Sequence, residues 1–201
     1  IQWQNMICEK GFSKTYERML QNQLTALFNH AQKIYNLNNN PCKKVKKMGK
    51  SDADKMEFWT KEEYDRYLSS LEQGTENYLI AEILFWTGIR EGELLALTSS
   101  DFDFKNNLLH ISKTYNRING KDVITLPKTE TSNRTISIPE FLKEEVQDYI
   151  KGYYGMPENE RLFPIVARTL QKRMKRFMEK AGVKVIRVHD MRHSHVAYLI
   201  H

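Results

Sequence analysis

The chain has 201 residues, enough for one or two domains, and 40% of them are hydrophobic, which is sufficient for a packed core. A formal net charge of +6 favours a polyanionic partner such as nucleic acid, although charge alone is weak support for one. The sequence contains no apolar run of about eighteen residues, no signal-peptide pattern, and only two cysteines, Cys8 and Cys42. These features argue against a membrane protein or a disulfide-stabilised secreted protein, and they predict a cytoplasmic one.

The first part of the chain is predicted to be helical. Between residues 13 and 36 the apolar residues recur at steps of three and four, which indicates an amphipathic helix. Ser13 is suited to be its N-cap, and Pro41 cannot continue it. Residues 1–48 are therefore expected to form part of a small helical domain, with a generic helical hairpin as the alternative.

A basic stretch and a polar stretch follow. Four lysines in five residues are candidates for contact with DNA phosphates: Lys43, Lys44, Lys46 and Lys47. A solvated, flexible tether is the other interpretation of the same run. Residues 49–56 are polar or charged around Gly49 and are predicted to be a linker.

Residues 57–201 are predicted to form a second domain that begins with helices. Thr60 and Glu63 have the spacing of a capping box at a helix start. The largely apolar segment 78–86 predicts a buried helix. Gly88 ends that helix, and Arg90 opens a short one that ends near residue 97.

The middle of this domain is rich in strand-forming residues. Strands are predicted over 108–115, 123–126 and 134–138, and Asn119-Gly120 is a strong hairpin signal between the first two. They would form a small three-stranded antiparallel sheet, with Lys128 in or near the turn between the second and third strands. The predicted fold class is therefore mainly α with a small antiparallel β-sheet (α+β).

Two helices are predicted after the sheet. One opens at Pro139-Glu140 and ends near residue 153, and the other covers 167–181 with Gly182 as its C-cap. The second helix carries a cluster of basic residues that could follow a DNA groove: Lys172, Arg173, Lys175 and Arg176. A merely solvated face is the competing interpretation.

The last thirteen residues contain a histidine and an arginine three positions apart, His189 and Arg192, at the start of a predicted helix. Asp190 falls in its first turn, where a carboxylate suits the positive helix end. A spacing of three brings a proton carrier near a permanently charged guanidinium on one helical face. This arrangement is suited to holding a phosphate while a proton moves beside it, although the pattern alone is weak.

Three motifs occur in order: T-G-x-R-x-G-E-L-x-x-L at 87–97, P-K-T-x-x-S-x-R-x-I-x-I-P at 127–139, and H-D-x-R-H at 189–193. Their order and spacing resemble the tyrosine recombinase, or phage integrase, family over roughly residues 10–201. The wording is most similar to integrases of phages and conjugative transposons from Gram-positive bacteria. The resemblance implies a catalytic domain at 57–201, preceded by part of a helical core-binding domain that clamps DNA.

The resemblance also implies roles for individual residues. Arg90 and Arg192 would neutralise the oxygens of a DNA phosphate, Lys128 would be the general acid, and His189 would take or give the nucleophile's proton. Lys113 and Lys121 are the nearest competitors of Lys128. The supporting residues would be Glu93 and Asp190. A tyrosine would form a 3′-phosphotyrosine, and no metal or cofactor is expected.

The sequence departs from the family pattern after the H-x-x-R motif. The family's nucleophilic tyrosine lies further downstream, and none of the ten tyrosines stands in that context. Tyr198 is interpreted as a core residue, and His193 and His195 as helix surface or packing residues. The chain is expected to be truncated before the nucleophile, and thus to bind DNA without cleaving it.

The predicted function is site-specific recombination that integrates or excises a mobile element. A non-catalytic DNA-binding regulator is the alternative. A type IB topoisomerase, which would use a similar active-site pocket, is a further candidate that the motif at 87–97 disfavours. The expected partners are double-stranded attachment sites, a homotetramer in the full-length protein and an excisionase or DNA-bending helper, without a membrane. The expected setting is the cytoplasm of a bacterial or phage-infected cell.

Overall fold

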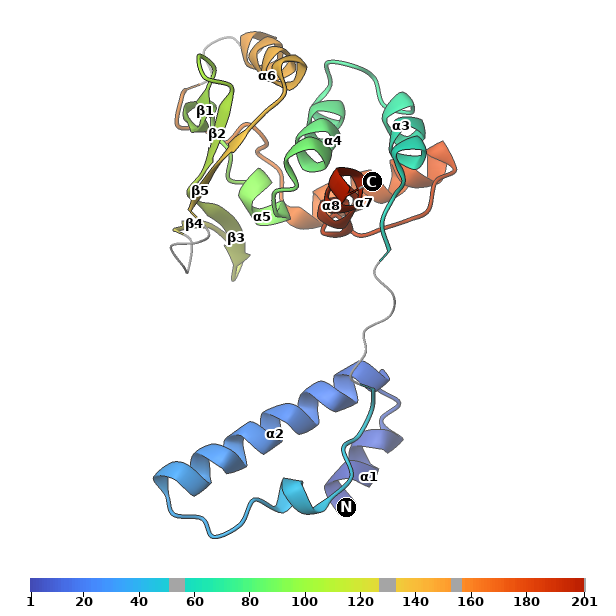
Figure 1. Cartoon of the computed structure of the whole chain (residues 1–201), viewed down its shortest axis with the longest axis vertical. Coiled ribbons are helices and arrows are strands. Elements are labelled where there is room, and N and C mark those ends of the chain that lie inside the picture. Colours follow the sequence, from blue (N-terminus) through green and yellow to red (C-terminus); the bar gives the residue numbers. More distant parts are fainter. Residues whose placement is uncertain (51–56, 127–132, 153–156, 201) are drawn as a thin grey trace. The chain divides into compact units, whose positions relative to one another are not determined.

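The computed structural model describes residues 1–50, 57–126, 133–152 and 157–200, and the chain divides into two compact units, 1–56 and 57–201 (Figure 1). The helices of the first unit are α1 (Gln2–Glu9), α2 (Lys14–Ile34) and the short 3₁₀ helix η1 (Pro41–Lys44). The predicted N-cap is present, because Ser13 Oγ accepts a hydrogen bond from the backbone N–H of Tyr16 at 3.3 Å. The long helix of this unit thus begins where the sequence predicts.

The apolar stripe of α2 is largely exposed within the described residues. Leu27 is 63% exposed and Ile34 is 54% exposed, whereas the buried positions of the helix are polar, Glu17 and Gln21. Hydrogen bonds to these polar side chains, one of them from the segment that returns along α2, offset the cost of burying them. Gln21, for example, accepts a hydrogen bond from the backbone N–H of Met48.

This returning segment contains the lysine run. Arg18 donates to the carbonyl of Gly49 at 3.0 Å, and Gln4 donates to the carbonyl of Lys46 at 2.8 Å, so backbone groups within the run and just after it are held by the two helices. The side chains of the run are exposed: Lys43, Lys44, Lys46 and Lys47. The lysine side chains therefore face solvent from a backbone that is hydrogen-bonded to α1 and α2.

The second unit is built around a helix that is buried on nearly all sides. Its helices are α3 (Lys61–Ser69), α4 (Glu76–Thr87), α5 (Glu91–Leu94), the 3₁₀ helix η2 (Ser99–Asp101), α6 (Glu140–Gly152), α7 (Ala167–Ala181) and α8 (Asp190–Ile200). The capping box of Thr60 and Glu63 at the start of α3 is confirmed. In the part of the chain that is described, no helix combines the length and apolarity needed to cross a membrane.

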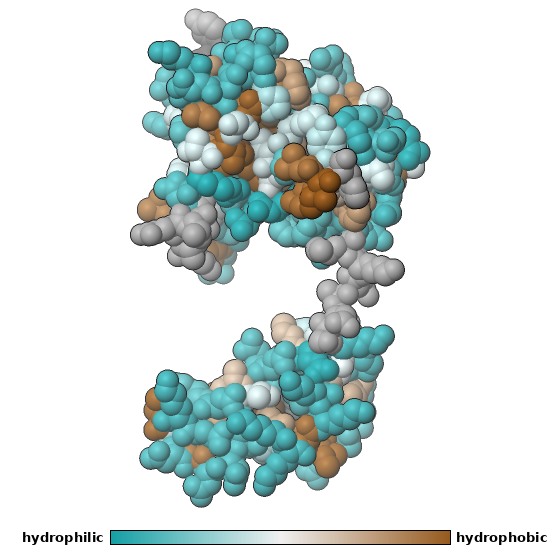
Figure 2. Space-filling view, viewed as in Figure 1, coloured by the Kyte–Doolittle hydropathy of each residue, from teal (hydrophilic) through white to brown (hydrophobic). Residues whose placement is uncertain are grey.

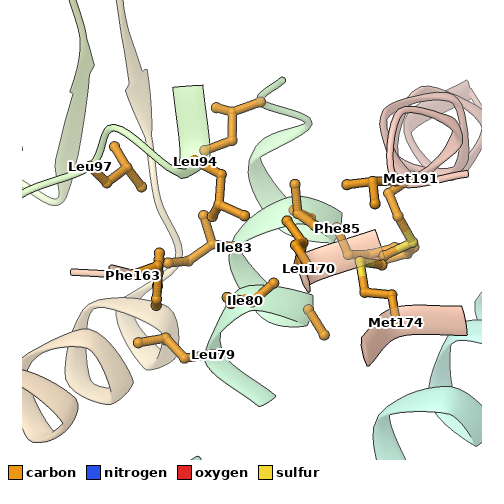
Figure 3. Close-up of a cluster of buried hydrophobic side chains, with 14 of the residues drawn as sticks. Leu79, Ile80, Ile83, Phe85, Leu94, Leu97, Phe163, Leu170, Met174 and Met191 are labelled. Carbon is orange, nitrogen blue, oxygen red and sulfur yellow. The ribbon is translucent and has the colours of Figure 1, made fainter. Parts of the chain in front are cut away.

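Helix α4 forms the centre of the core (Figure 3). Its residues Ile80, Ile83 and Phe85 are each at most 1% exposed. The side chains packed around them come from later elements and include Leu94, Phe163, Leu170, Met174 and Met191. The core therefore joins α5, α7 and α8 to α4, which fixes the ends of these helices relative to one another.

The antiparallel strands form two small sheets. One has three strands in the order β1-β2-β5, namely β1 (Phe102–Asp103), β2 (Leu108–Ile111) and β5 (Arg134–Ser137). The other is a hairpin of β3 (Thr114–Ile118) and β4 (Lys121–Thr125). The predicted fold class, mainly α with a small antiparallel sheet, is confirmed.

The assignment of strands to the sheet was wrong in part. The predicted strand 108–115 is interrupted after Ile111, and Lys113, which lies in the gap before β3, forms an ion pair with Asp101. The strands predicted as second and third therefore belong to different sheets, and β5 pairs with β2 directly. The hairpin signal was right, since Asn119 and Gly120 have φ values of 51° and 78°, as a two-residue hairpin turn requires.

Candidate functional site

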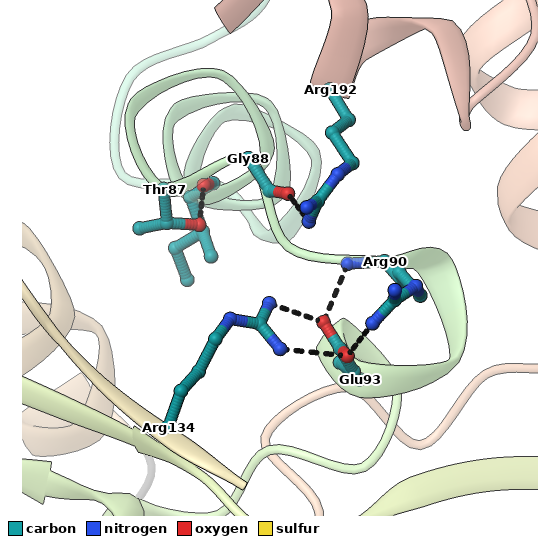
Figure 4. A network of polar contacts seen from close by, with 7 residues as sticks. Thr87, Gly88, Arg90, Glu93, Arg134 and Arg192 are labelled. Carbon is teal, nitrogen blue, oxygen red and sulfur yellow. Dashed lines mark hydrogen bonds and ion pairs between the residues drawn. The ribbon is translucent and has the colours of Figure 1, made fainter. Parts of the chain in front are cut away.

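The turn between α4 and α5 holds the arginine of α8. Gly88 ends α4 with φ 58°, and its carbonyl accepts a hydrogen bond from Arg192 Nη1 at 2.7 Å (Figure 4). A Cβ at position 88 would lie 2.6 Å from Cδ2 of His195, the residue one turn after Arg192. Glycine is thus required here both by the left-handed backbone and by the close approach of α8.

The carboxylate of Glu93 forms hydrogen bonds with two arginines, Arg90 and Arg134. It accepts from the backbone N–H of Arg90 at 2.8 Å and from Arg90 Nη1 at 2.8 Å. From β5, Arg134 donates through Nη1 at 3.0 Å and through Nη2 at 2.8 Å, which is a bidentate pair (Figure 4). The start of α5 and strand β5 are thereby held together at the site.

The cluster brings three positively charged groups within electrostatic range of one another. Burial alone would raise the pKa of Glu93, but hydrogen bonds from Arg134 and Arg90 lower it to about 2, so the carboxylate is ionised at neutral pH. Burial and the nearby charges of Arg90 and Arg134 lower the pKa of the Arg192 guanidinium. Among the described residues, Arg90 and Arg134 bind the carboxylate of Glu93, and Arg192 lies within electrostatic range of all three groups. An oxyanion such as a phosphate would relieve the repulsion, and the half-exposed side chain of Arg90 can reach one.

The histidine of the third motif is the residue immediately before α8. His189 is exposed and directly precedes the helix, and its carbonyl accepts from the backbone N–H of Arg192 at 3.2 Å. Asp190 is buried and accepts three hydrogen bonds from Arg187, from the backbone N–H, Nε and Nη2, at 2.9–3.0 Å. These bonds fix the start of α8 and leave the imidazole of His189 open to solvent.

The lysine predicted as the general acid, Lys128, lies outside the described residues. Of its two competitors, Lys113 donates to Asp101 and to Thr98, each at 2.8 Å, so its ammonium group is committed to an internal cluster. Lys121 is exposed next to the hairpin turn. Of these two lysines, Lys113 is bound within the protein and Lys121 is exposed to solvent.

The basic residues predicted to bind DNA differ in their availability. On α7, Lys172, Lys175 and Arg176 are exposed, whereas Arg173 donates to the carboxylate of Glu76 on α4. The same helix is anchored beside α5, because Gln171 donates to the carboxylate of Glu91 at 3.0 Å. In the described ranges, no three His, Cys, Asp or Glu side chains are grouped so as to hold a metal ion.

Residues 57–201 match the sequence model of the phage integrase family. The chain belongs to this family. The relationship to tyrosine recombinases that the three motifs predicted is therefore confirmed.

Two curated relatives give the degree of similarity. The ICEBs1 integrase of Bacillus subtilis (strain 168) is 30% identical over 216 residues, which cover 97% of the chain and 56% of the relative. A XerC-like tyrosine recombinase of Caldanaerobacter subterraneus is 27% identical over 228 residues, covering 97% and 58%. The chain thus spans little more than half the length of these relatives.

Solved structures of integrases share the fold. The Tn1549 transposon integrase, in complex with a circular intermediate DNA, superposes with a TM-score of 0.80 at 25% identity, covering 99% of the chain and 71% of that protein. A lambda integrase dimer bound to a COC′ core site has a TM-score of 0.63 at 17% identity, covering 96% and 69%. At 17% identity, the similarity to the lambda integrase shows a shared fold alone.

One residue of the site in this integrase-family chain was not predicted, although the sequence carries a signal for it. In β5, Arg134 alternates with Ile136 and Ile138, which are partly or fully buried. A period of two therefore places Arg134 on the inward face of the strand, where an arginine needs a partner. The inward arginine meets Glu93.

The interpretation of Tyr198 as a core residue was wrong. Its side chain is 41% exposed, and its ring contacts those of Phe85 and Trp86 from one side only, with centroids 5.7 and 5.4 Å away. The reason is that the end of α8 lies at the surface, where Figure 2 shows an apolar patch. By contrast, His195 packs against Gly88, as one of its two predicted roles requires.

Proposed function

We propose that this chain is the DNA-binding and phosphate-activating part of a site-specific recombinase that integrates or excises a mobile element. The observation that carries the proposal is the cluster of Arg90 and Arg134 on the carboxylate of Glu93, with Arg192 in electrostatic range. Guanidinium groups placed this closely can bind two oxygens of the same anion. Because the chain belongs to the phage integrase family, we take that anion to be a DNA phosphate.

Arg90 and Arg192 would bind the two non-bridging oxygens of the cleaved phosphodiester. Negative charge builds on these oxygens as the phosphorus becomes five-coordinate, so guanidinium groups already in place stabilise the transition state more than the ground state. Glu93 keeps Arg90 directed by accepting from both its backbone and its side chain. Loss of either arginine is expected to slow cleavage by about 10²–10³-fold.

Two proton transfers accompany the displacement. The oxygen of a tyrosine attacks phosphorus and forms the 3′-phosphotyrosine, while the bond to the 5′ oxygen breaks. His189, which is exposed three residues before Arg192, would take the tyrosine proton, and Lys128 would protonate the leaving 5′ oxygen. The 5′ hydroxyl of another strand reverses the same step, so strands are exchanged without an external energy source.

The nucleophile is assigned to no tyrosine of residues 1–201. Tyr64, Tyr67, Tyr115 and Tyr149 are buried away from solvent, and the ring of Tyr198 packs on α4. We infer that these 201 residues bind DNA without forming a covalent adduct.

Double-stranded DNA is the partner that the charge distribution supports. Exposed lysines lie on the first unit, and an exposed basic face lies on α7 of the second. The Tn1549 and lambda integrases were both solved in complex with DNA. Attachment-site duplexes, a homotetramer on DNA and an excisionase or DNA-bending helper are the proposed partners.

Covalent trapping tests this function. The product of the complete reading frame is incubated with nicked duplexes from the DNA that flanks the gene, quenched in SDS and examined for protein-linked DNA. We expect an adduct that is lost in Arg192→Ala. Tight binding without any adduct across all flanking duplexes would instead support a non-catalytic regulator.

The 201-residue chain gives a second, separate readout. It is expected to bind duplex DNA with a steep loss of affinity as salt rises, and without any adduct. The paired change of Lys172 and Arg176 to alanine should lower the slope of log affinity against log salt by about 2. An adduct formed by this chain would show that one of its own tyrosines is the nucleophile.

A further inference from the structure

The hairpin β3–β4 forms a sheet of its own, so contacts other than a shared sheet must fix its direction. This matters because β4 ends at Thr125, three residues before Lys128, the proposed general acid. Whatever orients the hairpin relative to α5 also sets where the chain starts toward that lysine.

One arginine contacts both strands of the hairpin. The guanidinium of Arg161 stacks over the ring of Tyr115 in β3, with its carbon 4.2 Å from the ring centroid. Its Nη1 also donates to three backbone carbonyls, those of Leu95 at 3.1 Å, Phe163 at 3.2 Å and Ile165 at 3.0 Å. The side chain is only 15% exposed, so these contacts are shielded from water.

The second strand of the hairpin is tied to the same group. Asp122 in β4 accepts from the hydroxyl of Tyr115 at 2.8 Å and from Arg161 Nη2 at 3.5 Å. Tyr115 itself is buried. Arg161, Tyr115 and Asp122 therefore connect both strands to the body of the unit.

The other end of this connection is α5. Leu95, whose carbonyl Arg161 holds, directly follows that helix. At Gly92, within α5, an added Cβ would lie 2.5 Å from Thr114 Oγ1 and 3.0 Å from the carbonyl of Tyr115. The hairpin is thus seated directly on the helix that begins at Arg90.

We propose that Arg161 is a positioning residue of the recombination reaction, which fixes the β3–β4 hairpin against α5. It thereby sets the end of β4, from which the chain continues toward Lys128, relative to the phosphate-binding Arg90. This inference rests on the function proposed above. Arg161 acts through Tyr115 and Asp122 and contacts no reacting atom.

The nature of the leaving group distinguishes this role from a general structural one. A duplex with sulfur in place of the bridging 5′ oxygen releases a thiolate, which needs no protonation, so a misplaced general acid no longer matters. In the product of the complete reading frame, Arg161→Lys should slow cleavage of the oxygen substrate by about 10²-fold and leave the sulfur substrate near the wild-type rate. Lys128→Ala should show the same pattern.

A hairpin-side variant guards against misfolding. Asp122→Asn removes the negative charge that faces Arg161 and keeps the three carbonyl contacts of Arg161, and it should give a smaller change in the same direction. Equal slowing on both substrates, or no slowing in either variant, would overturn the proposal.

Amide hydrogen exchange in the 201-residue chain tests the anchoring without catalysis. Arg161→Lys should speed exchange across residues 114–125 by about tenfold or more. The matched control is Arg117→Ala, since Arg117 reaches the same Asp122 at 3.5 Å from an exposed position. Equal exchange in the two variants would overturn the anchoring. If the wild type forms no adduct on either substrate, the proposed function fails, while exchange still decides the anchoring.

Discussion

At the scale of single residues, the site depends on a buried carboxylate whose partners are all arginines. A buried ion pair is weak support for stability, but removing one member leaves charges without compensation. Glu93 is placed so that its loss would release Arg90 and Arg134 together. Its contribution should therefore be visible in both stability and pH dependence.

Glu93→Gln tests that contribution. The folded-state pKa of about 2 lies below the ordinary value of 4.5, so the stabilisation is present above about pH 4.5 and is lost as the pH falls toward 2. We expect the variant to lose about 3 kcal/mol in the free energy of unfolding at pH 7, and the difference from wild type to shrink below pH 4.5. Urea unfolding measures both, with the exposed Glu72→Gln as control. A difference that does not change with pH would contradict the assignment.

Gly88→Ala tests the turn whose carbonyl accepts the hydrogen bond from Arg192. Gly182 is the matched control, because it has a similar φ of 64° at the end of α7 but open space around the added Cβ. Gly182→Ala should cost about 1 kcal/mol through the backbone alone. Gly88→Ala should cost about 2 kcal/mol more, since the methyl group meets His195. Equal melting temperatures for the two variants would show that His195 of α8 is not packed closely against Gly88.

The residue scale also shows what sequence reasoning can reach. The motifs pointed to Arg90, Glu93 and Arg192, which the fold brings into mutual electrostatic range. The motif that contains Arg134 was recognised, yet its arginine was given no role, although an arginine on the inward face of a strand needs a partner. Only its alternation with two inward isoleucines distinguishes it.

At the scale of elements, α4 combines an apolar surface with one buried acid. Glu82 is buried among Tyr64 and Lys61 from α3, Glu145 from α6 and Trp86 from its own helix. Burial and the charge of Glu145 raise its pKa to about 7. The carboxyl group is thus held partly protonated near neutral pH.

Glu82→Gln should remove a pH dependence of stability. Because the folded-state pKa is raised above 4.5, the stabilisation is fully present below about pH 4.5 and is lost as the pH rises through 7. The variant should therefore exceed wild type by about 1–3 kcal/mol at pH 8 and match it near pH 5. Urea unfolding at the two pH values measures this, with the exposed Glu179→Gln as control. A variant that is less stable at pH 8 would contradict the raised pKa.

Helices could be predicted better than sheet partners, for a physical reason. The helix of 167–181 was predicted with its observed limits, since its apolar period and the following Gly182 are local signals. The pairing of β2 with β5 skips an entire hairpin, and alternation within a strand does not specify its neighbour. Non-local contacts, such as that of Lys113 with Asp101, decide where a strand ends.

At the scale of the whole molecule, the two units differ in how they are stabilised. In residues 1–50 the buried hydrophobic side chains are Ile7 and Met48, whereas the second unit has a continuous core around α4. Little apolar burial means a small free energy of opening. We expect the first unit to open well before the second.

Amide hydrogen exchange in the intact chain measures this difference. The amides of α2 should exchange with a free energy of opening that is at least about 2 kcal/mol lower than those of α4. Added duplex DNA should slow exchange in α2, because binding stabilises the folded form. Equal protection of α2 and α4 without DNA would contradict the separate stability of the units.

The central claim is that the arginine cluster neutralises the charge of a DNA phosphate. Replacing one non-bridging oxygen at the cleavage site by a methyl group removes that charge, so the cation needed to balance it becomes dispensable. In the complete gene product, Arg192→Ala should form almost no adduct on the phosphate duplex and approach the wild-type rate on the methylphosphonate duplex. Equal impairment of Arg192→Ala on both duplexes would contradict the claim.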